Sequence, residues 1–146
     1  MALDFPQSPQ LDEVFVAGDR AWKWNGYAWD KISAGTGTGI FGVVLFYPGA
    51  PDPGEVIFGH VAAWPVFFPD DMSGSQAHAA TPAPVETDFQ ILKNSGEVGL
   101  LRFNADSATG TFLTNPAFSL APGDVLEVVA LNSDLSDIYL TLSGTR

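Results

Sequence analysis

The stretch Ile138–Ser143, IYLTLS, shows the most regular alternation of side chains in the sequence and decides the fold class. Large aliphatic residues occupy every second position, and Tyr139, Thr141 and Ser143 lie between them. Such a period of two is typical of a β-strand with one buried face and one solvated face.

The rest of the chain supports the same interpretation. Its 15 Gly and 11 Pro are scattered and divide the sequence into pieces too short for most helices. We therefore expect an all-β protein, in which a jelly-roll-like antiparallel β-sandwich follows a small three-stranded meander. The strands expected in the sandwich are Phe41–Tyr47, Val56–Phe67 (bent or broken near Pro65), Gln76–Ala80, Thr87–Lys93, Val98–Asn104, Thr109–Thr114, Val125–Leu131 and Ile138–Ser143.

Two turns are also predicted within the sandwich. Pro122-Gly123 before Asp124 fits a type II turn, in which glycine supplies the positive φ. The segment Lys93–Glu97, KNSGE, fits a hairpin loop between two strands.

The expected meander contains an aromatic cluster, WKWNGYAWDK at Trp22–Lys31, in which three of the four tryptophans fall within eight residues. Gly18-Asp19 and Asn25-Gly26 both fit two-residue hairpin loops. These loops predict that Phe15, Trp22 and Trp29 form one row and that Trp24 and Tyr27 form a second row on the same face.

A three-stranded sheet of this size buries too little apolar area to offset the entropy of ordering it, so its aromatic face needs a cover. Three coverings are open: the chain's own segment Phe5–Leu11, a second copy of the chain, or a different protein. A further alternative is that the rings form an exposed platform for sugars.

The small polar stretch Ser33–Gly39, SAGTGTG, predicts a flexible domain boundary. We expect an aromatic module at residues 1–34, a linker at 35–39 and the sandwich at 40–146. The glycines do not indicate phosphate binding, because the sequence has no strand-to-helix unit after them and no P-loop lysine.

Composition narrows the function. Six Lys and Arg against 17 Asp and Glu give a formal net charge of −11, which disfavours nucleic acids and anionic membrane surfaces as partners. Cysteine is absent, so thiolate catalysis and disulfides are excluded. The sequence predicts neither a cleavable signal nor a membrane-spanning segment.

No residue pattern predicts catalysis, a metal site or a cofactor. The two histidines, His60 and His78, are interpreted as a structural residue and as a residue facing a partner subunit. No nucleophile elbow is present, and with 17 acidic residues some carboxylate pairs are expected by chance. The acidic loops at Asp70-Asp71 and Asp134–Asp137 lack a calcium-binding spacing. We expect a protein that is not an enzyme.

Two sets of motifs resemble virion proteins. The pattern Phe5-Pro6-x-Ser8-Pro9, Phe15-x-x-Gly18 and Trp22-x-Trp24-x-Gly26-x-Ala28-Trp29 resembles a short module of tailed-bacteriophage appendage proteins. The segments VVLFYPGAPDPGEVIFGHVAAWPVFFP, FQILKNSGEVGLLRFNADSATGTF, FSLAPGDVLEVVA and LSDIYLTLSGTR resemble a β-sandwich at the C-terminal end of phage tail proteins.

This resemblance implies a structural subunit of a phage particle, located in the virion after assembly in the host cytoplasm. The expected role is a tail-fibre or tail-appendage subunit. The alternatives are a head-decoration or head-fibre protein and a stand-alone carbohydrate-binding module.

The expected partners are other virion proteins, further copies of the chain in a homotrimer, and a host surface glycan. A subunit seam is expected at Phe67 and Phe68. Contacts of the sandwich are expected in the loops Pro48–Glu55 and Pro69–Ser75, at Asp52, Asp70 and Asp71. The residues expected to mediate attachment are Phe15, Trp22, Trp24, Tyr27 and Trp29.

Overall fold

The computed structural model describes residues 5–17, 20–32, 39–132 and 134–146. The chain divides into two compact units, Met1–Thr38 and Gly39–Arg146. Most of the predicted linker, residues 35–38, and the predicted loop Gly18-Asp19 lie outside the described residues. Within the described part nearly all regular structure is β-strand, so the predicted all-β class is confirmed.

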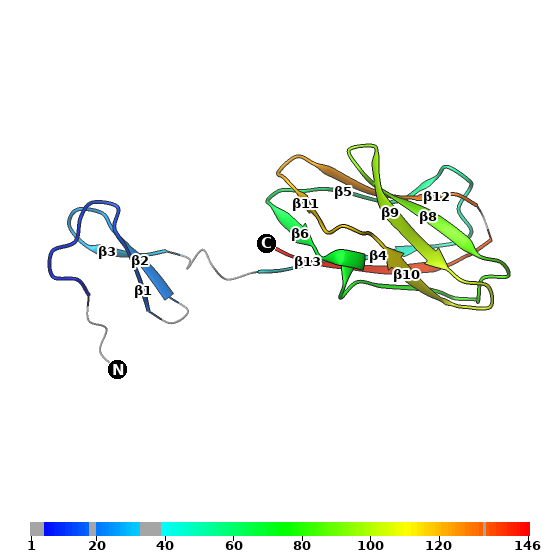
Figure 1. Cartoon of the computed structure of the whole chain (residues 1–146), viewed down its shortest axis with the longest axis horizontal. Helices are drawn as coiled ribbons and strands as arrows, with labels where there is room; N and C mark the ends of the chain where they lie inside the picture. Colours follow the sequence, from blue (N-terminus) through cyan, green and yellow to red (C-terminus); the bar gives the residue numbers. More distant parts are fainter. Residues whose placement is uncertain (1–4, 18–19, 33–38, 133) are drawn as a thin grey trace. The chain divides into compact units, whose positions relative to one another are not determined.

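The first unit is a three-stranded antiparallel meander of β1 (Val14–Ala17), β2 (Arg20–Trp24) and β3 (Trp29–Ile32) (Figure 1). Phe15 pairs with Trp22, and Ala17 pairs with Arg20, as the first predicted hairpin requires. The first half of the predicted register is therefore confirmed.

The predicted register of the second hairpin is wrong. Trp24 pairs with Trp29 and Trp22 pairs with Lys31, so the two-residue loop is Gly26-Tyr27 and begins one residue later than predicted. Asn25 causes this shift, because its Oδ1 accepts hydrogen bonds from the backbone amides of Tyr27 and Ala28, at 2.9 and 2.8 Å. The pairing moves by two residues, so Trp22, Trp24 and Trp29 still share one face.

The second unit contains all the remaining strands and one short 3-10 helix. Their bounds are β4 (Ile40–Tyr47), β5 (Val56–Val61), β6 (Val66–Phe68), η1 (Asp70–Met72), β7 (Gln76–Ala79), β8 (Thr87–Lys93), β9 (Gly96–Phe103), β10 (Thr109–Leu113), β11 (Phe118–Leu120), β12 (Val125–Ala130) and β13 (Ile138–Thr145).

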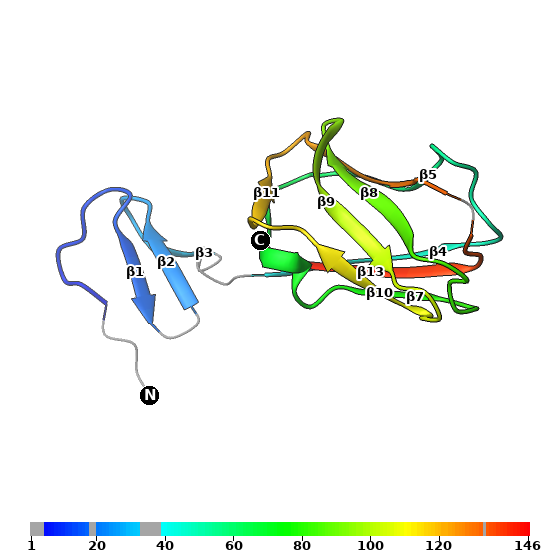
Figure 2. The same ribbon diagram turned by 45° about the vertical axis from the view of Figure 1, so that its right-hand side comes forward.

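The strands of this unit pair in a nested order, in which the first strand pairs with the last and the following strands pair inward from there. β4 pairs with β13, β5 with β12, β6 with β11, β7 with β10, and β8 with β9. β13 also pairs with β7, and β12 with β8, which gives two layers, β4-β13-β7-β10 and β5-β12-β8-β9 (Figures 1 and 2). β9 also pairs with β10, so the two layers are joined along this edge into one continuous antiparallel sheet. This nested pairing is the strand order of a jelly roll.

The core lies between the two layers. The inward positions of β13, Ile138, Leu140 and Leu142, are at most 1% exposed, as their alternation predicts. Phe89 and Ile91 of β8 are equally buried. The turn at Gly123, with φ 91°, and the β8–β9 hairpin at Asn94-Ser95 also lie where they were predicted.

The predicted break of the strand Val56–Phe67 near Pro65 is confirmed, because β5 ends at Val61 and β6 begins at Val66. Two other details of the sandwich differ from expectation. β11 was not predicted, because a strand of three residues carries too little pattern to recognise. Phe68 is 0% exposed and packs on Phe41 and Phe118, so it belongs to the core and not to a subunit seam.

Candidate functional site

The rings of the first unit form an aromatic cluster of Phe5, Phe15, Trp22, Trp24 and Trp29. The ring of Phe5 lies 5.0 Å from Phe15, 5.4 Å from Trp22 and 5.3 Å from Trp29, measured between centroids. Trp22 is 9% exposed, and the other four are partly exposed. The chain's own N-terminal segment therefore covers the aromatic face, which is one of the three coverings considered.

Tyr27 is the predicted attachment residue that the structure separates from the others. It lies in the loop and is 93% exposed, so it forms no row with Trp24. Leu11, 68% exposed, places its side chain against Gly26, beside Tyr27. We call Leu11, Gly26 and Tyr27 the tip. Leu11 was not among the predicted attachment residues, because it lies in the segment before β1 and far from Gly26 along the chain.

The loop of Asp52 is held by hydrogen bonds of its own. The amide of Asp52 donates to Oε2 of Glu55 at 2.9 Å, and the amide of Glu55 donates back to the Asp52 carbonyl at 2.9 Å. A hydrogen bond from the Tyr47 hydroxyl lowers the pKa of Glu55 and raises that of Tyr47. Asp52 is exposed, and its carboxylate remains available at the surface.

Asp70 and Asp71 contact a distant part of the chain. Oδ1 of Asp71 accepts the amide of Thr114 at 3.2 Å, and the Asp71 amide donates to the Thr114 carbonyl at 2.9 Å. Oδ1 of Asp70 accepts the amide of Ala117. These carboxylates fasten η1 to the segment before β11, which gives them a structural role that the sequence did not indicate.

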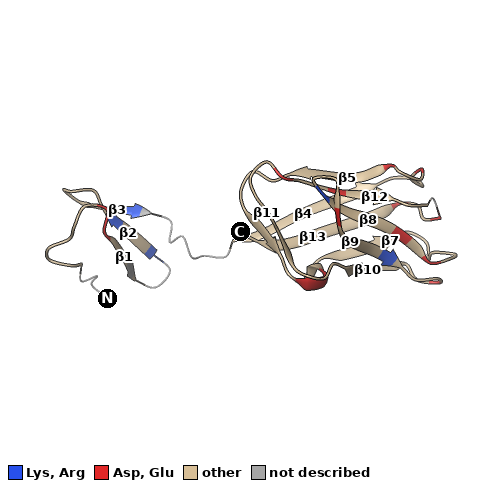
Figure 3. Ribbon diagram, turned by 45° about the horizontal axis from the view of Figure 1, so that its top comes forward, with Lys and Arg blue, Asp and Glu red and all other residues tan. Residues whose placement is uncertain are grey.

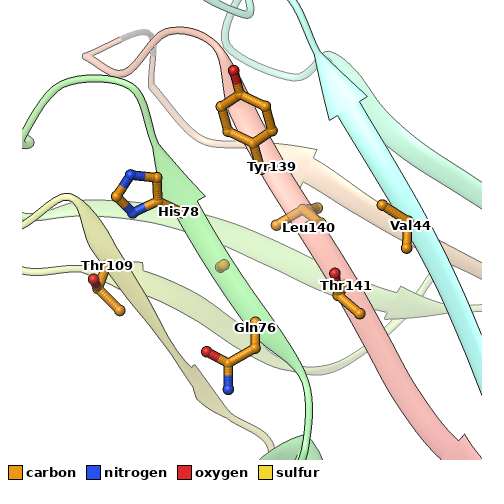
Figure 4. Close-up of a pocket in the computed structure, with 8 residues that line it drawn as sticks. Val44, Gln76, His78, Thr109, Tyr139, Leu140 and Thr141 are labelled. Atoms are coloured by element: carbon orange, nitrogen blue, oxygen red, sulfur yellow. The ribbon is translucent and has the colours of Figure 1, made fainter.

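A groove that the sequence analysis did not predict crosses the outer face of the β4-β13-β7-β10 layer. Its volume is about 320 Å³. Buried Ala77 and Leu140 lie at its floor, and the side chains around it come from four neighbouring strands (Figure 4). We call these the sheet groove: Val44, Gln76, His78, Thr109, Tyr139 and Thr141.

Strand pairing explains how these residues meet. Tyr139 pairs with Phe46 on one side and with His78 on the other, and His78 pairs with Thr109. In the next row Thr141 pairs with Val44 and with Gln76. The alternation at Ile138–Ser143 was the available signal, because it placed Tyr139 and Thr141 on the outer face.

A second hollow of about 440 Å³ adjoins the sheet groove along β7 and β10. The two share Gln76 and Thr109, and the second extends to Asp71 and Ser73. The two hollows together give this face a track that is longer than either one alone.

The outer faces of the two layers differ in charge. β4, β13, β7 and β10 contain no Asp, Glu, Lys or Arg. In the other layer Arg102 makes two hydrogen bonds to Asp88, of 2.8 and 2.7 Å, and Gln90 bonds to Glu97. Figure 3 shows acidic residues gathered mainly at the turns of the jelly roll, while β4 and β13 carry none.

Other kinds of site find no support in the described ranges. The residues that the structure describes contain no group of three or more His, Cys, Asp or Glu placed to bind a metal. Over the same residues, no helix is long and apolar enough to cross a membrane. His60, expected to be structural, is partly buried with its ring 5.2 Å from that of Phe41.

Comparison of the chain with family models, curated proteins and solved structures finds no match. Function therefore has to be argued from the two units and from their surfaces.

Proposed function

We propose that this chain is a structural component of a tailed bacteriophage particle, a tail-fibre or tail-appendage subunit. Its first unit docks to the particle, and its jelly roll is presented for assembly or host-surface adhesion. The observation that carries the proposal is the division into two units, each with a core of its own. A small module with an aromatic core suits attachment, and the motif resemblance described above agrees with that role.

The tip is the docking surface within this proposal. The rings of the aromatic cluster pack on one another and on Phe5, so they act mainly as the core of the module. Leu11 and Tyr27 remain exposed, and the side chain of Leu11 lies against Gly26, the residue before Tyr27. Tyrosine combines a large apolar ring with a hydroxyl group, and it is enriched at protein interfaces for that reason.

The test uses particles of the phage whose genome encodes the chain. We expect the double substitution Leu11→Ser and Tyr27→Ala to reduce the amount of chain in purified particles, measured by immunoblot. Val85→Ser is the matched control, because Val85 is an exposed apolar residue of the second unit. Absence of the unmodified chain from purified particles would overturn the proposal.

Electron microscopy of immunolabelled particles distinguishes a tail location from the head-fibre alternative. Removal of residues 1–34 tests the docking role directly. We expect the shortened chain to keep a cooperative unfolding transition and to be missing from particles. Unfolding of the shortened chain would show that the two units depend on each other.

A trimer belongs to the same proposal. Phe67 is 46% exposed on β6 and remains a candidate for the seam between subunits. Light scattering of the purified chain at micromolar concentration measures its mass, and a monomer would remove the trimer from the proposal.

A further inference from the structure

We infer that the sheet groove binds a neutral glycan, with the ring of Tyr139 as the surface against which a sugar packs. This inference deepens the proposed function, since it names the ligand class and the site for the unit presented outward. It concerns the face of the sheet, whereas the sequence predicts outer contacts in the loops of Asp52, Asp70 and Asp71.

The ring of Tyr139 is held in position by its neighbours. Tyr139 is 47% exposed and stacks on Phe46, with ring centroids 4.7 Å apart and an angle of 30° between the planes. The imidazole of His78 lies 6.5 Å away on the other side. Two neighbours therefore limit the motion of the ring before any ligand arrives, which lowers the entropy lost on binding.

The other side chains of the sheet groove supply hydrogen-bonding groups that suit a sugar. Gln76 offers an amide, and Thr109 and Thr141 offer hydroxyl groups, each of which can both donate and accept hydrogen bonds. None of these three side chains hydrogen-bonds to another residue of the described chain. A sugar presents hydroxyl groups that donate and accept, together with an apolar C–H face that packs on an aromatic ring.

The charge around the groove favours a neutral ligand. The four strands that carry the groove contain no Asp, Glu, Lys or Arg, although the chain has a formal net charge of −11. An acidic glycan would meet no cationic partner there and would be repelled by the overall field. A neutral glycan avoids both costs and matches the polar and aromatic side chains.

The size of the site agrees with this class of ligand. A hollow of about 320 Å³ lies at the lower end of the range for small-molecule sites, ~300–1,000 Å³. The adjoining hollow along β10 extends the track from Gln76 and Thr109 toward Asp71 and Ser73, so an oligosaccharide has room for more than one residue.

The experiment uses the labelled full-length chain on a glycan array that carries the common neutral hexose and N-acetylhexosamine linkages beside sialylated and uronic-acid glycans. The neutral glycan that binds best is then titrated by calorimetry. We expect Tyr139→Ala to weaken its binding by about tenfold or more, and Gln76→Ala by severalfold. Trp64→Ala removes an aromatic side chain of similar exposure, 45% against 47% for Tyr139, from outside the groove and should leave glycan affinity unchanged.

Circular dichroism checks that each variant is folded. Should Tyr139→Ala fail to fold, Gln76→Ala decides, because the Gln76 side chain is exposed. No binding to neutral glycans, binding to acidic glycans alone, or binding that survives both groove substitutions would overturn the inference. An oligomer that Tyr139→Ala disperses would also overturn it, since a second copy would then cover the face.

Glycan binding is measured on the purified chain, whereas the proposed function is tested by incorporation into particles. A chain that joins particles and binds no glycan refutes only this inference. A chain that binds glycan and is absent from particles refutes only the proposed function.

Discussion

The ring of Phe5 meets the indole of Trp22 edge to face, with centroids 5.4 Å apart and an interplanar angle of 90°. Phe5 belongs to the segment before the meander, and Trp22 is the most buried ring of the aromatic cluster. A residue outside the sheet thus completes the core of the first unit, and the first prediction concerns its removal.

Phe5→Ala should destabilise the first unit by about 1–2 kcal/mol, less than a fully buried phenylalanine because Phe5 is partly exposed. Three of the four tryptophans lie in this unit, so tryptophan fluorescence during denaturant unfolding reports the change. Phe5→Leu should lose less. Equal stability of all three proteins would show that Phe5 does not hold the cluster.

Gly99→Ala should destabilise the jelly roll by about 1–3 kcal/mol through overpacking. A Cβ at Gly99 would clash with the carbonyl oxygen of Leu113, which is backbone and cannot easily move. The matched control is Gly42→Ala, since a Cβ there meets nothing within 4 Å. Thermal unfolding compares the two variants, and a similar loss in both would contradict the packing argument.

Asp71→Ala should lower the stability of the jelly roll by about 1 kcal/mol, because the bond to the Thr114 amide is lost. Asp71 has φ 52°, which alanine tolerates poorly. Asp71→Gly relieves that strain while still lacking the carboxylate, so it separates the two causes. Asp71→Asn, which keeps an acceptor oxygen, should lose least in denaturant unfolding.

The carboxylate of Asp124 should make the jelly roll sensitive to acid. Asn94 Nδ2 donates to Asp124 Oδ1 at 2.7 Å, the Ala121 amide donates to Oδ2 at 2.8 Å, and Lys93 Nζ lies 3.0 Å from Oδ2. The bond from Asn94 is the largest cause that lowers the pKa of Asp124, which falls to about 2.

Because this pKa is lower in the folded chain than in the unfolded chain, the stabilisation is complete above about pH 4 and is lost as the pH falls toward about 2. Asp124→Asn should therefore melt at a lower temperature than the unmodified chain at neutral pH, with a difference that shrinks between about pH 4 and about pH 2. Melting curves across this range measure the difference, and a difference that does not change with pH would contradict the assignment.

The features that the sequence predicted are those set by local pattern. Alternation at Ile138–Ser143 gave the strand, its buried face and the all-β class, and the glycine at position 123 gave its turn. The register of the second hairpin differs from the prediction by two residues, an even number, so the tryptophans lie on one face as predicted. The error itself arose from Asn25, whose side chain accepts hydrogen bonds from the backbone amides of Tyr27 and Ala28.

The features that the sequence did not predict depend on partners far along the chain. Asp71 accepts a hydrogen bond from the amide of Thr114, which lies 43 residues further along the chain, and no local pattern connects the two residues. The row Phe46, Tyr139 and His78 exists only because β13 pairs with both β4 and β7. The sequence indicated that the aromatic cluster needs a cover but left three coverings open. The position of Phe5 in the structure decides between them.

The pairing of the first strand, β4, with the last, β13, brings the two ends of the jelly roll together. The amide of Gly39 donates to the carbonyl of Arg146 at 2.9 Å, the amide of Arg146 donates back at 2.8 Å, and the Arg146 guanidinium lies 5.0 Å from the centroid of the Trp64 ring. Mechanical tension applied between Gly39 and Arg146 would therefore act first on the end of the β4–β13 ladder. Under that load the residue pairs of the β4–β13 ladder would separate one after another and not all at once. The contact between Trp64 and Arg146 lies at the end where this separation begins.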